Sequence, residues 1–240
     1  TLAHMAWNMA GADFAPASDR ALLVSLGNRI TPEAHLRVAA LARRLAADPI
    51  PHVSNIHPAY CSVLLVFDPL RIDHEQVAEG VAERLEAAGG APAAPRMVEI
   101  PVCYGGEFGP DLEAVAALHE MTPLRLVEIH SSAIYVAQFL GFAPGFAYLS
   151  GLADELATPR LDTPRAKVPA GSVAIAGKQA GVYPFETPGG WRVLGRTPLE
   201  VFRADRAPAN LIGLDDRVRF RPITRRQFEA IWLRIFDFCA

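Results

Sequence analysis

Glycine and proline are spread unevenly along this chain of 240 residues, and that distribution constrains the fold more than any other feature. Residues 1–90 contain 5 Gly and 6 Pro, whereas the shorter stretch 141–200 contains 9 Gly and 7 Pro. Both residues mark turns and interrupt helices, so the second stretch is limited to short elements joined by tight turns. We therefore predict a helix-bearing N-terminal part and a turn-rich, β-dominated C-terminal part.

The N-terminal part carries two clear helix-start signals. Thr31 is followed by proline and glutamate, as at the first turn of a helix. Asp73 and Gln76 have the spacing of a capping box. Strands are expected at residues 21–26, 52–56, 62–67 and 97–102. The order β-α-β-β-α-β predicts a ferredoxin-like domain over residues 19–98, preceded by a tail over residues 1–18.

The C-terminal part, residues 99–240, is predicted to be a β-barrel domain, so the fold class is α+β. Two helical patterns at 111–120 and 123–130 form a connection at its start. The expected strands lie at residues 134–140, 172–176, 191–195, 199–203 and 217–221. Closing such short strands into a barrel removes exposed sheet edges. A last helix is expected beyond residue 224.

The charge balance excludes several classes of partner. Twenty-three basic and 26 acidic residues give a net charge of −3, whereas nucleic-acid and anionic-membrane binders need a basic surface. A DNA-binding helix-turn-helix at 111–130 is not expected, because Glu128 offsets the lone Arg125 there. No run of 18 apolar residues is present, and the first residues do not resemble a secretory signal. We expect a cytoplasmic protein with no nucleic-acid or membrane partner.

The cysteines do not suggest a metal centre. Cys61, Cys103 and Cys239 are widely spaced, without a C-x-x-C pair or a paired Cys/His spacing. The sequence therefore predicts a reducing compartment and no metal ligands.

Five sequence motifs, one of them repeated, are more specific than folding alone requires, and together they resemble a known family. They read G-F-A-P-G-F-A-Y-L at 141–149, T-P-R at 158–160 and again at 163–165, V-P-A-G-S-V at 168–173, Y-P-F-E-T-P-G-G-W at 183–191, and G-R-T-P at 195–198. This pattern resembles the family that comprises KipI, the B-type subunit of 5-oxoprolinase and allophanate hydrolase subunit 1. The resemblance covers nearly the whole chain. It implies a cyclophilin-like β-barrel as the C-terminal domain, and a companion, the C-type subunit of 5-oxoprolinase or allophanate hydrolase subunit 2.

The same resemblance implies an activity. The favoured function is one subunit of an ATP-dependent hydrolase that converts 5-oxo-L-proline to L-glutamate and is inactive without its companion. ATP with Mg²⁺ is expected at the level of the complex, and no biotin is expected on this chain. Two alternatives stay open: a KipI-type inhibitor of a sensor histidine kinase, and a carboxyltransferase or allophanate hydrolase component that acts on urea-derived amides.

Binding residues are expected in the repeated T-P-R segments and in the β-region that follows. The planar guanidinium groups of Arg160 and Arg165 suit a carboxylate or phosphate. An equally good alternative is solvation, or pairing with Asp154, Glu155 or Asp162. The predicted net-positive pocket is bordered by Arg160, Arg165, Lys178 and Tyr183, with Gln179 as a further binding residue.

Three residues are catalytic candidates. His130 is predicted as a proton donor or acceptor, although a helix-terminal histidine that bonds backbone carbonyls is equally plausible. Lys178 is expected to stabilise developing negative charge, and Glu186 lies in the motif at 183–191. Gly171 and Gly177-Lys178 do not form a Walker loop, because the glycine spacing is wrong and Gln179 replaces the Ser/Thr that would hold magnesium.

Overall fold

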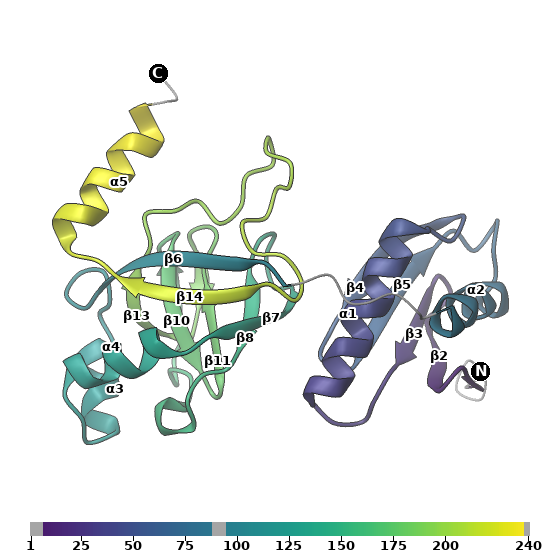
Figure 1. Ribbon diagram of the computed structural model, residues 1–240, viewed down its shortest axis with the longest axis horizontal. Coiled ribbons are helices and arrows are strands. Elements are labelled where there is room, and N and C mark those ends of the chain that lie inside the picture. Colours follow the sequence, from purple (N-terminus) through teal and green to yellow (C-terminus); the bar gives the residue numbers. More distant parts are fainter. Residues whose placement is uncertain (1–6, 88–94, 238–240) are drawn as a thin grey trace. The chain divides into compact units, whose positions relative to one another are not determined.

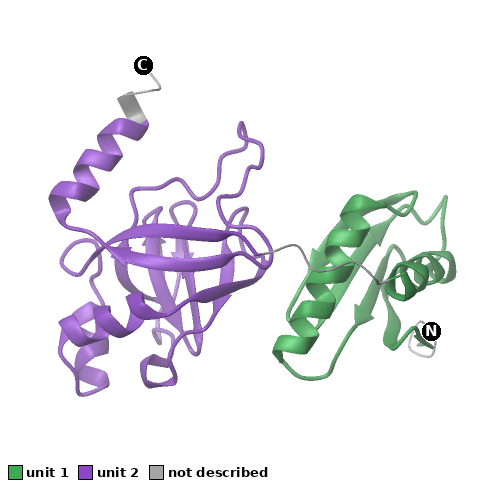
Figure 2. Ribbon diagram, viewed as in Figure 1, with its two compact units in different colours: residues 1–94 green, residues 95–240 purple. Residues whose placement is uncertain are grey.

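A computed structural model describes residues 7–87 and 95–237 of the chain. The chain divides into two compact units, residues 1–94 and 95–240, which Figure 2 shows in different colours. Each unit has its own hydrophobic core.

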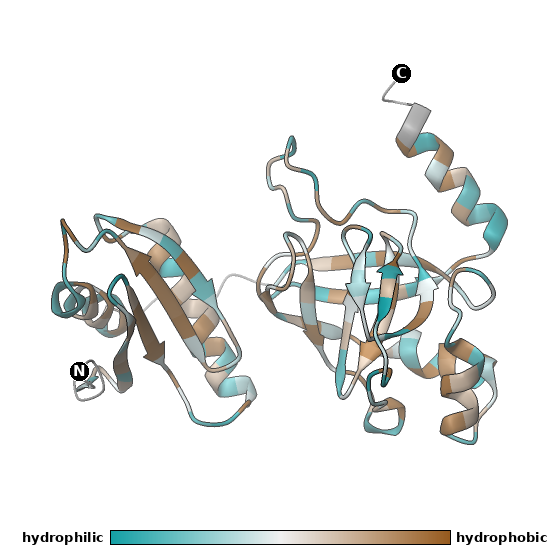
Figure 3. Cartoon of the chain, turned by 180° about the vertical axis from the view of Figure 1, so that it is seen from behind, coloured by the Kyte–Doolittle hydropathy of each residue, from teal (hydrophilic) through white to brown (hydrophobic). Residues whose placement is uncertain are grey.

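The N-terminal unit is an antiparallel sheet with the strand order β1-β2-β3-β5-β4 and two helices (Figure 1). Its elements are β1 (Trp7–Met9), β2 (Ala12–Ser18), β3 (Ala21–Ser25), α1 (Pro32–Ala47), β4 (Val53–Pro58), β5 (Ser62–Phe67) and α2 (His74–Glu86). The central strands β3 and β5 are largely hydrophobic (Figure 3). Alternate residues such as Phe14, Leu22 and Leu65 are fully buried and share one core with Val38 of α1 and Val77 of α2.

Both predicted helix starts are confirmed. The Thr31 hydroxyl accepts a hydrogen bond from the Ala34 backbone N–H at 3.2 Å. Asp73 and Gln76 form the reciprocal capping box, with bonds of 2.9 and 3.1 Å. These bonds satisfy N–H groups that a helix start leaves without a partner.

The structure corrects the predicted ferredoxin-like order at both ends. Residues 7–18, predicted within a tail, form two strands of the sheet, because a turn at Ala10-Gly11 with positive φ lets β1 fold back on β2. The segment Met97–Tyr104 is a barrel strand and not the last strand of the N-terminal sheet. The boundary therefore falls between residues 94 and 95, four residues before the predicted one.

The C-terminal unit is a closed barrel with the strand order β10-β11-β8-β7-β14-β6-β13. Its strands are β6 (Met97–Tyr104), β7 (Tyr135–Leu140), β8 (Ala147–Ser150), β10 (Ser172–Ala176), β11 (Gln179–Val182), β13 (Arg192–Arg196) and β14 (Arg217–Pro222). The two helices α3 (Leu112–Leu118) and α4 (Pro123–Ser132) occupy the predicted connection, and α4 lies against β14. The α+β class with a β-barrel is thus confirmed. The predicted strand at 199–203 is absent, and a single bridge joins Phe202 to Asn210 there.

A two-stranded ribbon of β9 (Arg165–Val168) and β12 (Thr187–Gly189) covers a second apolar cluster outside the barrel core. Val173 and Ile175 of β10 belong to the barrel core, whereas Ala174 and Ala176 alternate with them and belong to the second cluster. The ribbon therefore lies over the outer face of β10.

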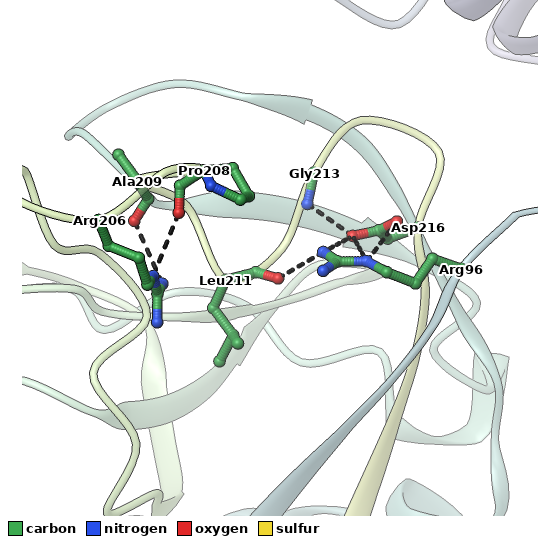
Figure 4. A network of polar contacts seen from close by, with 7 residues as sticks. All are labelled: Arg96, Arg206, Pro208, Ala209, Leu211, Gly213 and Asp216. Carbon is green, nitrogen blue, oxygen red and sulfur yellow. Dashed lines mark hydrogen bonds and ion pairs between the residues drawn. The ribbon is translucent and has the colours of Figure 1, made fainter. Parts of the chain in front are cut away.

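The long connection before β14 is held by one buried carboxylate. Arg96 donates through Nε and Nη2 to Asp216, and its Nη2 also donates to the Leu211 carbonyl at 2.6 Å (Figure 4). The Gly213 backbone N–H donates to the same carboxylate at 2.7 Å. Arg96 and Asp216 directly precede β6 and β14, so this network ties together the starts of two neighbouring parallel strands.

A last helix, α5 (Arg225–Asp237), follows β14 as predicted. Over the described residues, the helices lack the length and apolarity that crossing a membrane requires.

Candidate functional site

Tyr183 lies at the centre of the predicted binding region. It follows β11 and is only 2% exposed, with its ring edge-on to Phe146 at 5.3 Å. A Cβ on Gly189 would lie 2.3 Å from the Tyr183 oxygen, so the ribbon backbone passes directly over the phenol. Burial raises the pKa of Tyr183, while a backbone hydrogen bond from Trp191 and the positive charges of Arg160 and Arg165 oppose that rise.

Arg165 is bound to a buried carboxylate within the chain. Its Nη1 and Nη2 donate to the two oxygens of Asp111 at 2.9 and 2.6 Å. Asp111, just before α3, also accepts from the Val193 backbone N–H at 2.7 Å. Such a two-point pair fixes the guanidinium and neutralises its charge locally. Arg165 therefore ties the ribbon to α3 and β13.

Arg160 is placed differently, although it comes from the same T-P-R repeat. Its segment is held beside the turn after β12, because the Leu161 N–H donates to the Gly190 carbonyl at 2.7 Å and Arg192 donates to the Pro159 carbonyl at 3.2 Å. The Arg160 side chain is exposed and makes no hydrogen bond or ion pair with any residue that the structure describes. The Arg160 guanidinium is therefore unpaired among the described residues, and its positive charge acts to lower the pKa of Tyr183.

The remaining predicted residues do not join this pair. Lys178 forms an exposed ion pair with Asp154 at 2.7 Å, and Glu186 forms one with Lys167 at 2.9 Å. Lys178 lies in the turn between β10 and β11, while Tyr183 follows the far end of β11; at about 3.3 Å per residue the two are roughly 16 Å apart. Gln179, at the start of β11, is on the Lys178 side. Thr158, two residues before Arg160, is nevertheless paired with Gly177 next to Lys178. A single pocket bordered by all four residues stays a prediction.

His130 belongs to the barrel core. It is fully buried near the end of α4, stacked on Phe220 at 4.8 Å, and its Nδ1 is hydrogen-bonded to the Tyr104 hydroxyl at 2.8 Å. Burial lowers the pKa of His130 to about 3. A neutral, enclosed imidazole does not contact a substrate, so the predicted catalytic role of His130 is corrected to a structural one.

Two residues of this region were missed in the sequence. Asp111 is nearly buried, and a buried acid requires a basic partner, but no spacing rule links it to Arg165. Phe142 is 62% exposed with φ of 67°, an unusual conformation for an aromatic residue, and its ring lies edge-on to Tyr183 at 6.3 Å. Strained backbone of this kind is often found at functional sites. The G-F-x-P-G-F motif around Phe142 was the available signal.

Two exposed side chains neighbour the buried Tyr183: Arg160, whose charge acts on its phenol, and Phe142, whose ring lies edge-on to it. We call these two residues the Arg160 patch, which offers one cation and one exposed aromatic ring. This combination suits a small anion that also has an apolar part. Hollows of about 470, 370 and 170 Å³ elsewhere in the described residues are lined by other side chains. No group of His, Cys, Asp and Glu suited to a metal ion occurs among the residues described.

Comparison with known proteins assigns the chain to a class. A model of the carboxyltransferase domain, subdomain C and D, matches residues 12–212. The chain therefore belongs to this family, as its motifs indicated.

Individual relatives sharpen this assignment. The chain is 40% identical over 223 residues to the B-type subunit of 5-oxoprolinase from Bacillus subtilis, covering 88% of this chain and 93% of that protein. The solved structure of TTHA0988 superposes with a TM-score of 0.77 at 35% identity, over 85% of this chain; the chain spans only 40% of TTHA0988. The urea amidolyase of Kluyveromyces lactis shares the fold, with a TM-score of 0.74 at 17% identity over 95% of this chain and 16% of that chain.

Proposed function

We propose that this chain is the B-type component of an ATP-dependent 5-oxoprolinase and works with a companion, the C-type subunit of that enzyme. The observation that carries the proposal is the match over 93% of the Bacillus subtilis relative at 40% identity. A match of this extent leaves little of that protein without a counterpart in this chain.

The Arg160 patch supports this proposal chemically. 5-Oxo-L-proline is a small ring with one carboxylate and one lactam group. The Arg160 guanidinium is suited to the carboxylate or to a phosphate oxygen, and Phe142 offers an apolar surface to the ring. Stable lactams resist water, so the reaction uses ATP to phosphorylate the lactam carbonyl oxygen before water attacks the carbon and the ring C–N bond breaks. L-Glutamate, ADP and phosphate are then the products.

Within the proposal, ATP and its Mg²⁺ belong to the complex of this chain with its companion, and either subunit can contribute residues that bind them. Lys178 and Glu186 keep their proposed catalytic roles only if docking of the companion separates their exposed ion pairs.

The urea-directed alternative is supported by fold alone, since the likeness to urea amidolyase is at 17% identity. The kinase-inhibitor alternative has no structural feature in its favour among the described residues. The proposed function can be distinguished from both alternatives by its substrate, 5-oxo-L-proline, on which neither alternative acts.

The test is reconstitution by omission. This chain and its companion are purified separately, and L-glutamate formed from 5-oxo-L-proline and ATP is measured for each alone and for the mixture. We expect turnover in the mixture and little or none in either protein alone. Full turnover by the companion without this chain would refute the proposal.

A further inference from the structure

A hollow of about 470 Å³ lies in the N-terminal unit and has no part in the proposed function. It is lined by residues 25–28 at the end of β3, by Gly11 and Asp13 where β2 begins, and by Arg37 of α1. Small-molecule sites in proteins commonly have volumes of about 300–1,000 Å³, so this hollow is large enough for a small ligand.

Arg37 is held in place at this hollow by backbone carbonyl groups. The pairing of β2 with β3 ends at Asp13 and Ser25. Just beyond that pair, Arg37 Nη1 donates to the Leu26 carbonyl at 2.7 Å and Nη2 donates to the Gly11 carbonyl at 2.6 Å, so the guanidinium bridges the two chain segments. A planar group held through two of its nitrogens has a fixed orientation, and its other N–H groups stay available to a ligand.

The charges that line the hollow are not neutralised within the chain. Both partners of Arg37 are carbonyl groups, and Arg37 forms no ion pair with a carboxylate in the parts of the chain that the structure describes. Asp13 accepts a hydrogen bond from the Asn8 side-chain amide at 2.7 Å, and no cation among the same described residues pairs with it. Arg37 and Asp13 thus line one hollow without pairing with each other, so a ligand can interact with both.

The two charges of opposite sign determine the class of ligand. An inorganic anion would be attracted by Arg37 but repelled by Asp13, and a simple cation would experience the reverse. A zwitterion with a carboxylate and an ammonium group complements both residues. The side chains of Ser25 and Asn28 add polar groups that have no hydrogen-bond partner within residues 7–87 and 95–237.

We propose that this hollow binds a free α-amino acid with a neutral polar side chain. The carboxylate of the ligand accepts hydrogen bonds from Arg37, its ammonium group donates to Asp13, and its side chain contacts Asn28. Such a ligand has no net charge, which matches a lining with one cation and one anion. The inference does not depend on the proposed function, because the Arg160 patch belongs to the other unit.

The test is calorimetric titration of the full chain with L-glutamine as the probe. We expect saturable binding of L-glutamine. N-Acetyl-L-glutamine keeps the carboxylate and the side-chain amide but lacks the ammonium group, so it is expected to bind at least about tenfold more weakly. Inorganic phosphate, which meets Asp13 with a like charge, is expected to bind more weakly than L-glutamine.

Two variants assign the charged groups of the ligand to their partners. Asp13→Asn is expected to weaken L-glutamine binding by at least about tenfold and to leave the affinity for N-acetyl-L-glutamine unchanged, because only the contact with the ammonium group is lost. Arg37→Gln is expected to weaken the binding of both compounds. The matched control is Asp19→Asn, an exposed acid in the turn between β2 and β3, and its affinity for L-glutamine should stay within about twofold of the wild type. Circular dichroism checks that each variant is folded.

An absence of L-glutamine binding to the wild type would overturn the inference. Equal affinities of Asp13→Asn and Asp19→Asn for L-glutamine would also overturn it, even if Arg37→Gln does not fold. Phosphate binding as tight as that of L-glutamine would identify a plain anion site and would likewise contradict the proposal. None of these results bears on the turnover test of the proposed function.

Discussion

Arg160 and Arg165 come from the same repeated T-P-R motif but have different surroundings. Arg165 is 31% exposed at its side chain and is held by the nearly buried Asp111, whereas Arg160 has no such partner among the described residues. Removing Arg165 leaves the Asp111 carboxylate with the Val193 N–H but without its cation. We expect Arg165→Ala to lower the free energy of unfolding by about 1–3 kcal/mol. Arg160→Ala should change it by less than about 0.5 kcal/mol. Urea denaturation of both variants checks this contrast, and equal losses would contradict it.

For catalysis we expect the opposite order, with the larger effect from substitution of Arg160. Arg160→Ala removes the cation beside Tyr183, so kcat/KM of the reconstituted enzyme should fall by at least about tenfold, about 1.4 kcal/mol in transition-state stabilisation. Arg160→Lys, which keeps the charge but loses the planar fork, should recover part of the loss. Steady-state kinetics on folded variants make the measurement. Wild-type kinetics in Arg160→Ala would place this arginine outside the site.

Because His130 is buried and neutral in the folded protein, we expect the free energy of unfolding to depend on pH. Its pKa in the folded protein is about 3, because the buried ring is neutral, whereas an unfolded histidine titrates near 6.5. Between these values the unfolded chain binds a proton that the folded chain does not, so stability falls as the pH falls through this range. From pH 7 to pH 5 this one group should cost about 2 kcal/mol. Urea denaturation at both pH values should show that loss in the wild type and its absence in His130→Asn; identical pH dependence in the two proteins would contradict the assignment.

At the scale of elements, the ribbon depends on the close passage of Gly189 over Tyr183. A Cβ at Gly189 would lie 2.3 Å from the phenol oxygen, whereas one at the next residue, Gly190, would lie 3.6 Å from its nearest neighbour. Gly189→Ala must displace the tyrosine or the strand, and we expect it to cost about 1–3 kcal/mol of stability. Gly190→Ala should be nearly neutral. Thermal unfolding of the pair tests this, and the near-ultraviolet dichroism of Trp191 should change only in Gly189→Ala.

Elements whose sequence signals lie in neighbouring residues could be predicted, whereas those that depend on distant pairing could not. The helix starts at Thr31 and Asp73 depend on neighbouring residues, and both were predicted from spacing alone. The sheet to which Met97–Tyr104 belongs is set by its pairing with β14, more than 100 residues later. The hydrophobic pattern therefore predicted a strand but not the sheet that contains it. Residues 7–18 were missed because proline and alanine weaken the strand signal of β2.

The candidate site was predictable only in part for the same reason. The motifs marked Arg160 and Tyr183, and in the fold the charge of Arg160 acts on the buried Tyr183 phenol. Nothing in the spacing indicated that Asp111 would take up Arg165, or that Lys178 would lie at the opposite end of β11. Long-range ion pairs of this kind are set by topology, which periodicity does not reveal.

At the scale of the whole molecule, two units with separate cores make up a chain of the carboxyltransferase-domain family. Each has its own core, so each should unfold with limited influence from the other. The Arg160 patch belongs to the C-terminal unit.

The central claim is that this chain serves 5-oxo-L-proline hydrolysis. The most direct measurement is the ratio of L-glutamate to ADP formed by the complex of this chain with its companion, with 5-oxo-L-proline or urea as the substrate. We expect the two products to form in equal amounts from 5-oxo-L-proline, and neither product to form with urea. ADP formation with urea, or without any L-glutamate from 5-oxo-L-proline, would contradict this expectation.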